Sequence, residues 1–333
     1  MVIPPIFAVM LTADQINTLI ELRLGDISLP QTPEGLYDPA RYILNGGGKH
    51  IRPTLSMLSS NLFTDDLKPC EDVALAMEVF HNFTLVHDDI MDNAPTRRGR
   101  ATIHEKWDLA TGILSGDALL IKAYQLLSGI KKERLADVLN MFNQTALKVC
   151  EGQQLDMDFE TKTDVVLEDY ITMITGKTSV LLGCSLYCGA LAGGSDEVNA
   201  KLLYEAGIKL GNSFQIQDDV LDAFGDEKKF GKKPGGDIIQ NKKTYLILKA
   251  FEKADLTDIE HLKYLYSKKP LDEQNKIDSV MEVFIKYNIQ QDAELEMQKQ
   301  YNAAIALLKE VNVAEERKEN LYQFLEYIFK RSH

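Results

Sequence analysis

The chain has 333 residues, with 37 lysines and arginines against 50 acidic residues, which gives a formal net charge of −13. This balance excludes a dedicated nucleic-acid-binding protein, because such proteins present a basic face. Hydrophobic residues make up 45% of the chain and charged residues 26%, as in globular proteins, so a largely disordered or fibrous protein is also excluded.

The N-terminal part of the chain shows helical periodicity. Apolar residues recur every three or four positions over residues 12–24, which predicts a first helix. The proline-containing stretch 30–39 is expected to interrupt the helical structure. A second helix is predicted over residues 43–62, and a third, after a loop at 64–70, runs up to Asp88.

The remainder of the chain also indicates helices. They are predicted over residues 116–130, 135–159, 164–192, 197–221, 244–253, 272–311 and 314–330. No stretch alternates with a period of two for long enough to predict a sheet, and there is neither a fixed-period repeat nor a linker. We therefore expect one all-α domain over residues 1–333, in which residues 1–9 form either an upstream extension or a packed tail.

The cysteines and the N-terminus bear on the compartment. Cys70, Cys150, Cys184 and Cys188 form no C-x-x-C pair, and Cys184 and Cys188 lie in an apolar run as packed thiols. The apolar residues 1–11 lack a basic segment, contain two prolines and are far too short to span a membrane. We expect a reducing, cytoplasmic location without a membrane span.

Three Asp-Asp pairs occur, and their surroundings distinguish them. Asp65-Asp66 lies in a predicted loop before a helix, where capping and the helix dipole explain acidic residues. The run from Asp88 to Asp92 instead follows an apolar helix and places its outer carboxylates on one face. The same D-D-x-x-D spacing recurs at 218–222. One such turn can be a solvated face, whereas two with identical spacing indicate a shared function.

Carboxylates spaced in this way repel one another unless a cation joins them. An oxygen-only ligand set suits Mg²⁺, which keeps several waters and binds through one or two carboxylates plus substrate phosphates. The chain lacks the Cys and His spacing of a zinc site and the set of two Glu-x-x-His motifs that a di-iron bundle needs. The two acidic turns are therefore predicted to face each other across a helical bundle and to clamp a polyphosphate through Mg²⁺.

Basic residues lie near both acidic turns. Lys49 and Arg52 follow the glycine cluster 46–48, and Arg97 and Arg98 follow the first acidic turn. Ammonium and guanidinium groups are the usual partners of phosphate oxygens, although each residue taken singly also fits an ordinary surface charge. The lysine- and glycine-rich segment 224–244 is typical either of a mobile lid over phosphate or of a solvated loop.

Taken together, these motifs resemble those of the trans-type isoprenyl diphosphate synthases, the family of farnesyl and geranylgeranyl diphosphate synthases. The resemblance extends from about residue 37 to the C-terminus. The matches are Gly47-Gly48-Lys49, Arg52-Pro53, His81, Asp88 to Asp92, Arg97-Arg98-Gly99, Gly116-Asp117, Glu151-Gly152-Gln153, Lys177-Thr178, Phe214 to Gln217, Asp218 to Asp222, Lys232 and Lys242. His50, where arginine is common, and Arg100-Ala101-Thr102, where a version with proline is frequent, depart from the pattern without touching a required group. The resemblance implies an all-α helical bundle around a deep central cavity, usually a homodimer.

The resemblance also implies roles for individual residues. Three Mg²⁺ ions would hold the allylic diphosphate, with Asp88, Asp92 and Asp218 as direct ligands and Asp89, Asp219 and Asp222 in support. The allylic diphosphate would contact Arg97, Lys177, Lys232 and Lys242, and isopentenyl diphosphate would contact Lys49, Arg52, His81 and Arg98. Gln153 would belong to the substrate site. The Thr178 hydroxyl and the Lys177 and Gln215 carbonyls would orient dipoles toward the allylic cation, although capping or core roles also explain Thr178 and Gln215.

The implied reaction is the head-to-tail condensation of isopentenyl diphosphate with an allylic diphosphate. A terpene cyclase is disfavoured by the intact second acidic motif, and a head-to-head synthase by the isopentenyl-site residues Lys49, Arg52 and Arg98. A non-catalytic subunit of a heteromeric prenyl synthase is expected to have lost one of the two acidic motifs, and both are present.

The resemblance also implies that product chain length depends on residues upstream of Asp88, because in this family the product tail is expected to run back along that helix. Phe83 stands five positions before Asp88 and the small Thr84 four positions before it. Farnesyl synthases of this family often have aromatic residues at both positions. An aromatic residue only at the position five before Asp88, as here, resembles the geranylgeranyl type. Phe80 would form a second barrier. The sequence therefore predicts a C20 product, with C15 as the alternative.

Overall fold

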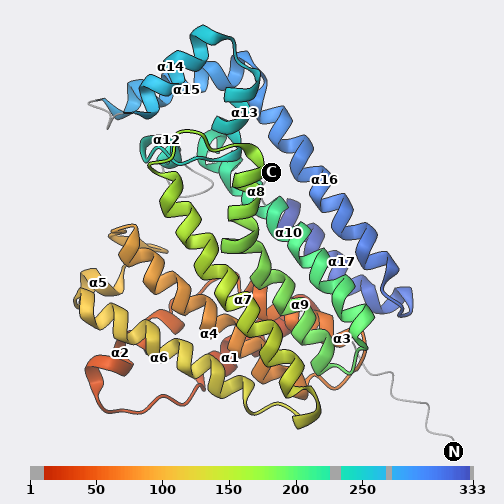
Figure 1. The fold of residues 1–333 in the computed structure, drawn as a ribbon. Helices are drawn as coiled ribbons and strands as arrows, with labels where there is room; N and C mark the ends of the chain where they lie inside the picture. Colours follow the sequence, from red (N-terminus) through yellow and green to blue (C-terminus); the bar gives the residue numbers. More distant parts are fainter. Residues whose placement is uncertain (1–10, 226–233, 268–271, 331–333) are drawn as a thin grey trace, which may run out of the picture. The chain divides into compact units, whose positions relative to one another are not determined.

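A computed structural model describes residues 11–225, 234–267 and 272–330 of the chain. The fold of these residues is all-α, as predicted, apart from one short hairpin (Figure 1). The chain forms two compact units, the first built from Met1–Phe142, Cys184–Leu203 and Val311–Glu326, and the second from Asn143–Gly183, Tyr204–Glu310 and Tyr327–His333. Four of the five boundaries between these segments fall inside helices, and the one between Glu310 and Val311 falls at the end of the helix Ile289–Glu310. A single domain stays a prediction.

Unit 1 consists mainly of the N-terminal helices. Its complete elements are α1 (Ala13–Gly25), α2 (Glu34–Leu44), α3 (Ile51–Asn61), α4 (Lys68–Met91), β1 (Thr96–Arg97), β2 (Arg100–Ala101), α5 (Ile103–Lys106) and α6 (Leu109–Leu127). Helix α4 contacts α1, α2, α3, α5 and α6, and Figure 1 shows it in orange beside the yellow α6. Side chains on every face of α4 are buried, including Val73, Met77 and Phe80, so α4 is the central helix of this unit.

Four helices contribute residues to both units. They are α7 (Lys132–Phe159), α9 (Val180–Ala192), α10 (Glu197–Phe224) and α17 (Glu315–Lys330). Within unit 1, the end of α9 packs on α3 through small residues. A Cβ atom added at Gly189 would lie 2.1 Å from the Ser56 carbonyl oxygen, and one at Gly193 would lie 2.5 Å from that of Ser60. The two backbones therefore touch directly.

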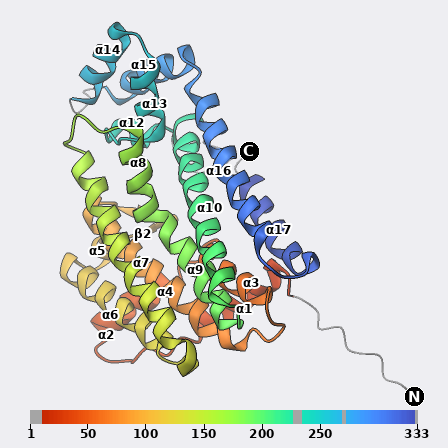
Figure 2. The same ribbon diagram turned by 45° about the vertical axis from the view of Figure 1, so that its right-hand side comes forward.

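Unit 2 contains the complete elements α8 (Leu167–Ile174), η1 (Thr175–Ser179), α12 (Gly236–Ile239), α13 (Tyr245–Lys253), α14 (Leu256–Tyr266), α15 (Glu273–Lys286) and α16 (Ile289–Glu310). Its core includes Tyr170, Ile216, Leu246 and Phe284. Helix α16 contacts α13 and α15, and the view in Figure 2 shows all three in blue and cyan colours.

Several predicted boundaries are wrong. The predicted helix over 43–62 is interrupted, because Gly47, Gly48 and His50 adopt φ angles of +68°, +152° and +43°, which end α2 and delay α3. The expected break at 30–39 is shorter, since α2 already begins at Glu34 with Pro33 as its N-cap. The predicted helix over 272–311 is divided near Asn288, which has a φ of +53°.

One helical stretch, Leu167–Ala192, is long and apolar enough to cross a membrane by length and composition. In this fold, however, 67% of its apolar window is buried, as in the core helix of a soluble protein. The cysteines behave as predicted: all four are free thiols, and Cys184 and Cys188 are buried. The possible extension at residues 1–9 lies outside the described residues.

Candidate active site

The first acidic turn lies at the C-terminal end of α4 in unit 1. Asp88 and Asp92 are four residues apart, and the Asp92 N–H donates to the Asp88 carbonyl over 2.8 Å. Asp89 lies between them, is buried, and accepts a hydrogen bond of 2.8 Å from Arg97 Nε. Burial raises the pKa of Asp89, and Arg97 partly opposes that rise. The protein itself therefore engages Asp89, and the two outer carboxylates are more accessible.

Arg97 and Arg98 are placed by the hairpin that follows α4. Strands β1 and β2 pair Arg97 with Arg100, so Arg98 and Gly99 form the two-residue turn. Both have left-handed φ angles, +52° and +71°, as a primed hairpin turn requires. The Arg98 guanidinium donates to the Gly47 carbonyl. A Cβ atom at Gly48 would lie only 2.8 Å from Arg98 Nη1, so the glycine cluster makes room for this arginine.

Four of the predicted isopentenyl-site and phosphate-site residues form a basic cluster in unit 1, namely Arg52, His81, Arg97 and Arg98. Desolvation lowers the pKa of His81 well below its ordinary value, and the nearby positive charges of Arg52, Arg98 and Arg97 lower it further. His81 is therefore a neutral imidazole among guanidinium groups. Lys49 is exposed in the turn before α3. Such a cluster in a protein of net negative charge can hold a polyanion.

Aromatic side chains line α4 behind the acidic turn. The Phe83 ring centroid lies 5.4 Å from that of Phe80, and Phe80 lies 5.0 Å from Phe142 of α7. The ring of Phe142 in turn lies 5.1 Å from that of Tyr124 on α6. Thr84 donates its hydroxyl to the carbonyl of His81 over 2.8 Å. The predicted barrier residues Phe83 and Phe80 thus belong to one contiguous aromatic group.

The second acidic turn lies near the end of α10 in unit 2. Asp219 is buried and accepts from the Tyr170 hydroxyl at 2.6 Å and from the Tyr245 N–H at 3.0 Å. Burial, together with the negative charge of Asp237, raises the pKa of Asp219 to about 8. The Asp222 carboxylate accepts from the Asp237 N–H at 2.9 Å. Asp218 is exposed.

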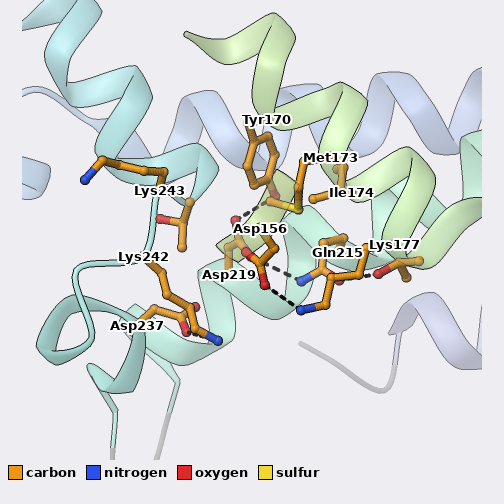
Figure 3. A pocket seen from close by; sticks show the side chains of 12 residues that line it. Asp156, Tyr170, Met173, Ile174, Lys177, Gln215, Asp219, Asp237, Lys242 and Lys243 are labelled. Atoms are coloured by element: carbon orange, nitrogen blue, oxygen red, sulfur yellow. Dashed lines mark hydrogen bonds and ion pairs between the residues drawn. The ribbon is translucent and has the colours of Figure 1, made fainter. Parts of the chain in front are cut away.

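A π-helical turn, η1, presents Lys177 and Thr178 to a pocket in unit 2 (Figure 3). Turns of this kind are frequent at functional sites because they re-aim side chains within a helix. Lys177 Nζ lies 2.5 Å from Asp156 Oδ2. The Thr178 hydroxyl donates to Gln215 Oε1 at 3.0 Å, and Gln215 Nε2 donates to Asp219 at 3.4 Å.

The backbone of η1 packs directly on α7. A Cβ atom added at Gly152 would lie 2.1 Å from the Lys177 backbone nitrogen and 2.5 Å from the Gly176 carbonyl carbon. Gln153, the next residue, is buried in α7. The matched motifs Glu151-Gly152-Gln153 and Lys177-Thr178 are therefore neighbours in space, and Gly152 is required by the close approach.

The predicted lid is described only in part. Lys232 lies outside the described residues. Lys242 lines the same pocket as Lys177, and its ammonium lies 4.0 Å from Asp237 Oδ1. Burial and the charge of Asp222 raise the pKa of Asp237 to about 6.

The carboxylates fit a Mg²⁺ site that needs the substrate. Among the residues that the structure describes, no three His, Cys, Asp or Glu side chains gather as a ready-made metal cage. Asp89 and Asp219 are occupied by protein donors. An ion that takes one or two carboxylates and fills its shell with water and phosphate oxygens suits this donor set.

Three residues of the unit 2 pocket were missed by sequence reasoning. Asp156, Tyr170 and Asp237 contact Lys177, Asp219 and Asp222, respectively. Asp156 could have been noticed because it lies four residues after Gly152, on the same face of a helix. Tyr170 and Asp237 carry no comparable signal, since their roles depend on tertiary packing.

Comparisons with known proteins agree with the motifs. The family model described as polyprenyl synthetase matches residues 33–284. The geranylgeranyl diphosphate synthase of Methanosarcina mazei is 42% identical over 237 residues, which are 70% of this chain and 73% of that protein. The synthase of the same name from Saccharolobus solfataricus is 36% identical over 294 residues, 87% of this chain and 88% of that protein. A crystal structure of a geranylgeranyl pyrophosphate synthase superposes with a TM-score of 0.92 at 42% identity, covering 97% of this chain and 99% of that one.

Proposed function

The chain belongs to the polyprenyl synthetase family and is a prenyltransferase, and we propose that it condenses isopentenyl diphosphate with an allylic diphosphate to give the C20 product geranylgeranyl diphosphate. Relatives named geranylgeranyl diphosphate or pyrophosphate synthase, at 36–42% identity, support the C20 length over the farnesyl alternative. The observation that carries the proposal is the presence of two D-D-x-x-D turns, each accompanied by basic side chains.

The proposed roles assign one substrate to each group of basic residues. Lys177, Lys242 and Arg97 hold the allylic diphosphate, while Lys49, Arg52, His81 and Arg98 hold isopentenyl diphosphate. Lys232 is expected to join the first group. The neutral state of His81 supports this assignment, since a neutral imidazole can donate one hydrogen bond to phosphate without adding charge to three guanidinium groups.

We propose that Mg²⁺ is the cofactor, held by Asp88, Asp92 and Asp218 together with the allylic diphosphate, and that three ions bind when the diphosphate is present. Bound there, the metal neutralises charge on the leaving diphosphate. Asp89, Asp219 and Asp222 hold the surrounding donors in place. The hydrogen bonds of Asp89 with Arg97 and of Asp219 with Tyr170 support this division.

In the reaction, the allylic C–O bond breaks and the diphosphate leaves with the electron pair. The isopentenyl double bond attacks the allylic cation, a C–C bond forms, and a proton is lost to the departing diphosphate. The chain's part is to orient dipoles toward the cation and to exclude water. Thr178 donates to Gln215 Oε1, and in the proposal this contact fixes the direction of the Gln215 carbonyl dipole.

Product length provides the direct test. Purified protein with Mg²⁺, labelled isopentenyl diphosphate and an allylic primer should yield a C20 product by chromatography after dephosphorylation. Phe83→Ala should lengthen the product, because Phe83 and Phe80 form the barrier behind Asp88, about 7.5 to 12 Å along the helix. Phe324→Ala, which removes a buried ring from α17 of the same unit, is the matched control and should keep C20. A parental product of C30 or longer, or unchanged length in Phe83→Ala, contradicts the proposal.

We further propose a homodimer in the cytoplasm. Helix α6 exposes Leu109, Ile113, Leu114 and Ile121, each with 43% or more of its surface accessible, although a solvated helix normally places polar residues there. A second copy of the chain would cover this row. Sedimentation should therefore show a dimer, and the double variant Leu114→Glu and Ile121→Glu should give a monomer; a parental monomer contradicts the proposal.

A further inference from the structure

A buried lysine in unit 2 has no part in the proposed chemistry. Lys276 lies in the first turns of α15, only 3% of its surface is accessible, and its ammonium donates to the side-chain oxygen of Asn241. The same ammonium lies 4.9 Å from the centroid of the Tyr266 ring. Burial, together with the charge of Lys243, lowers the pKa of Lys276 to about 8. A buried ammonium is costly, so its retention calls for an explanation.

The partner of Lys276 occupies a special backbone position. Asn241 has a φ of +59° and follows the short helix α12. Its N–H donates to the Ile238 carbonyl and the N–H of Lys242 donates to the Asp237 carbonyl, at 3.2 and 3.0 Å. This is the Schellman pattern, in which glycine or asparagine takes the left-handed position. The backbone direction of Lys242 is therefore set at Asn241.

Lys243, which follows Lys242, contacts the same aromatic ring as Lys276. The ammonium of Lys243 lies 5.4 Å from the centroid of Tyr266, so one ring contacts two cations. Burial and the carboxylates of Asp237 and Asp222 raise the pKa of the Tyr266 hydroxyl. Helices α14 and α15 thus hold both neighbours of Lys242, through Tyr266 and Lys276.

We propose that Lys276 is a positioning residue, which through Asn241 fixes Lys242 in the orientation that binds the diphosphate of the allylic substrate. The inference rests on the proposed function, in which Lys242 contacts that diphosphate. An arrangement of substrate-binding groups that is displaced by even about 1 Å loses much of its effect. A neutral residue of similar length would fill the Lys276 position without the desolvation cost, so stability alone does not account for the ammonium.

Steady-state kinetics with each substrate varied in turn tests this role. Lys276→Met should raise the KM for the allylic diphosphate by about tenfold, the loss expected for one charge-assisted contact, and leave the KM for isopentenyl diphosphate within about twofold. Asn241→Gly should give the same pattern, because glycine keeps the left-handed backbone and removes only the acceptor. Asn241→Asp, which keeps an acceptor for Lys276, should retain the parental allylic KM.

Two further variants make the outcome decisive. If Lys276 acts through Asn241, the double variant Lys276→Met and Asn241→Gly should be no worse than the worse single variant. Lys299→Met, which removes an exposed lysine from α16 of the same unit, is the control and should match the parent.

Other results overturn the inference. They are equal KM changes for both substrates, additive losses in the double variant, an unchanged allylic KM in folded Lys276→Met or Asn241→Gly, or an unchanged allylic KM in Lys242→Ala. Product formation by the parental enzyme is measured separately and tests the proposed function, so the two failures are distinguishable.

Discussion

The contact between Gly152 and η1 makes a sharp prediction for Gly152→Ala. The added methyl group would lie 2.1 Å from the Lys177 nitrogen, and an ordinary contact is at least 3.4 Å, so α7 and η1 would have to part by about 1.3 Å. Both neighbours are backbone, which cannot rotate away as a side chain does. Overpacking of this kind costs about 1–3 kcal/mol of unfolding free energy. A displacement of about 1 Å at the groups that hold a substrate reduces the rate by about 10²-fold.

Gly35→Ala is the matched control for this substitution. Gly35 lies in α2, and a Cβ atom there would meet nothing within 4 Å, so alanine should keep the parental rate and slightly raise stability. The two variants are compared by turnover with both substrates saturating and by urea unfolding. Parental turnover and an unchanged unfolding midpoint in Gly152→Ala would show that the close approach is not required, and would refute the reasoning.

Three further predictions follow from the site. Asp88→Ala should lose about 10²-fold or more in turnover, whereas Asp66→Ala, in an exposed loop, should not; equal rates with Mg²⁺ contradict the metal role. Arg98→Ala should mainly raise the KM for isopentenyl diphosphate, and Lys177→Ala should mainly raise the KM for the allylic substrate. Equal effects on both KM values would contradict the assignment of these basic residues to different substrates. In the unfolded chain His81 binds a proton near pH 6.5, whereas in the folded chain its pKa lies well below that value. The free energy of unfolding should therefore fall as the pH drops below 6.5. In His81→Gln the free energy of unfolding, measured with urea, should fall less over the same pH range. An identical dependence on pH in the parent and the variant would contradict the low pKa of His81.

The helices and the acidic motifs could be predicted because their signals are local. Apolar periodicity and the repeated D-D-x-x-D spacing identify α4 and α10 without any tertiary information. Boundaries set by backbone conformation were harder to predict. Residues 46–50 were included in one predicted helix, yet the positive φ angles of Gly47, Gly48 and His50 create the turn that receives the Arg98 guanidinium.

The contacts within the candidate site could be predicted only in part. The sequence indicates Lys177 and Thr178 through resemblance, but not the π-helical turn that re-aims them, because no pattern distinguishes an extra residue in a long apolar helix. Asp156 and Tyr170 owe their roles to partners 21 and 49 residues away in the chain. Such pairings arise from packing and have no local signature.

The π-helical turn has a consequence for insertions and deletions. Thr175–Ser179 carries one more residue per turn than its helical flanks, α8 and α9. Deleting one residue there would restore an ordinary α-helix and preserve helicity and apolar content. It would also rotate every preceding side chain about the helix axis by about 100° relative to those that follow. The side chains of α8 and of Lys177 could then no longer both project in their present directions. Under the proposed function, a single codon lost at this point would therefore move Lys177 away from the position that holds the allylic diphosphate, while a codon lost in an exposed loop would change little.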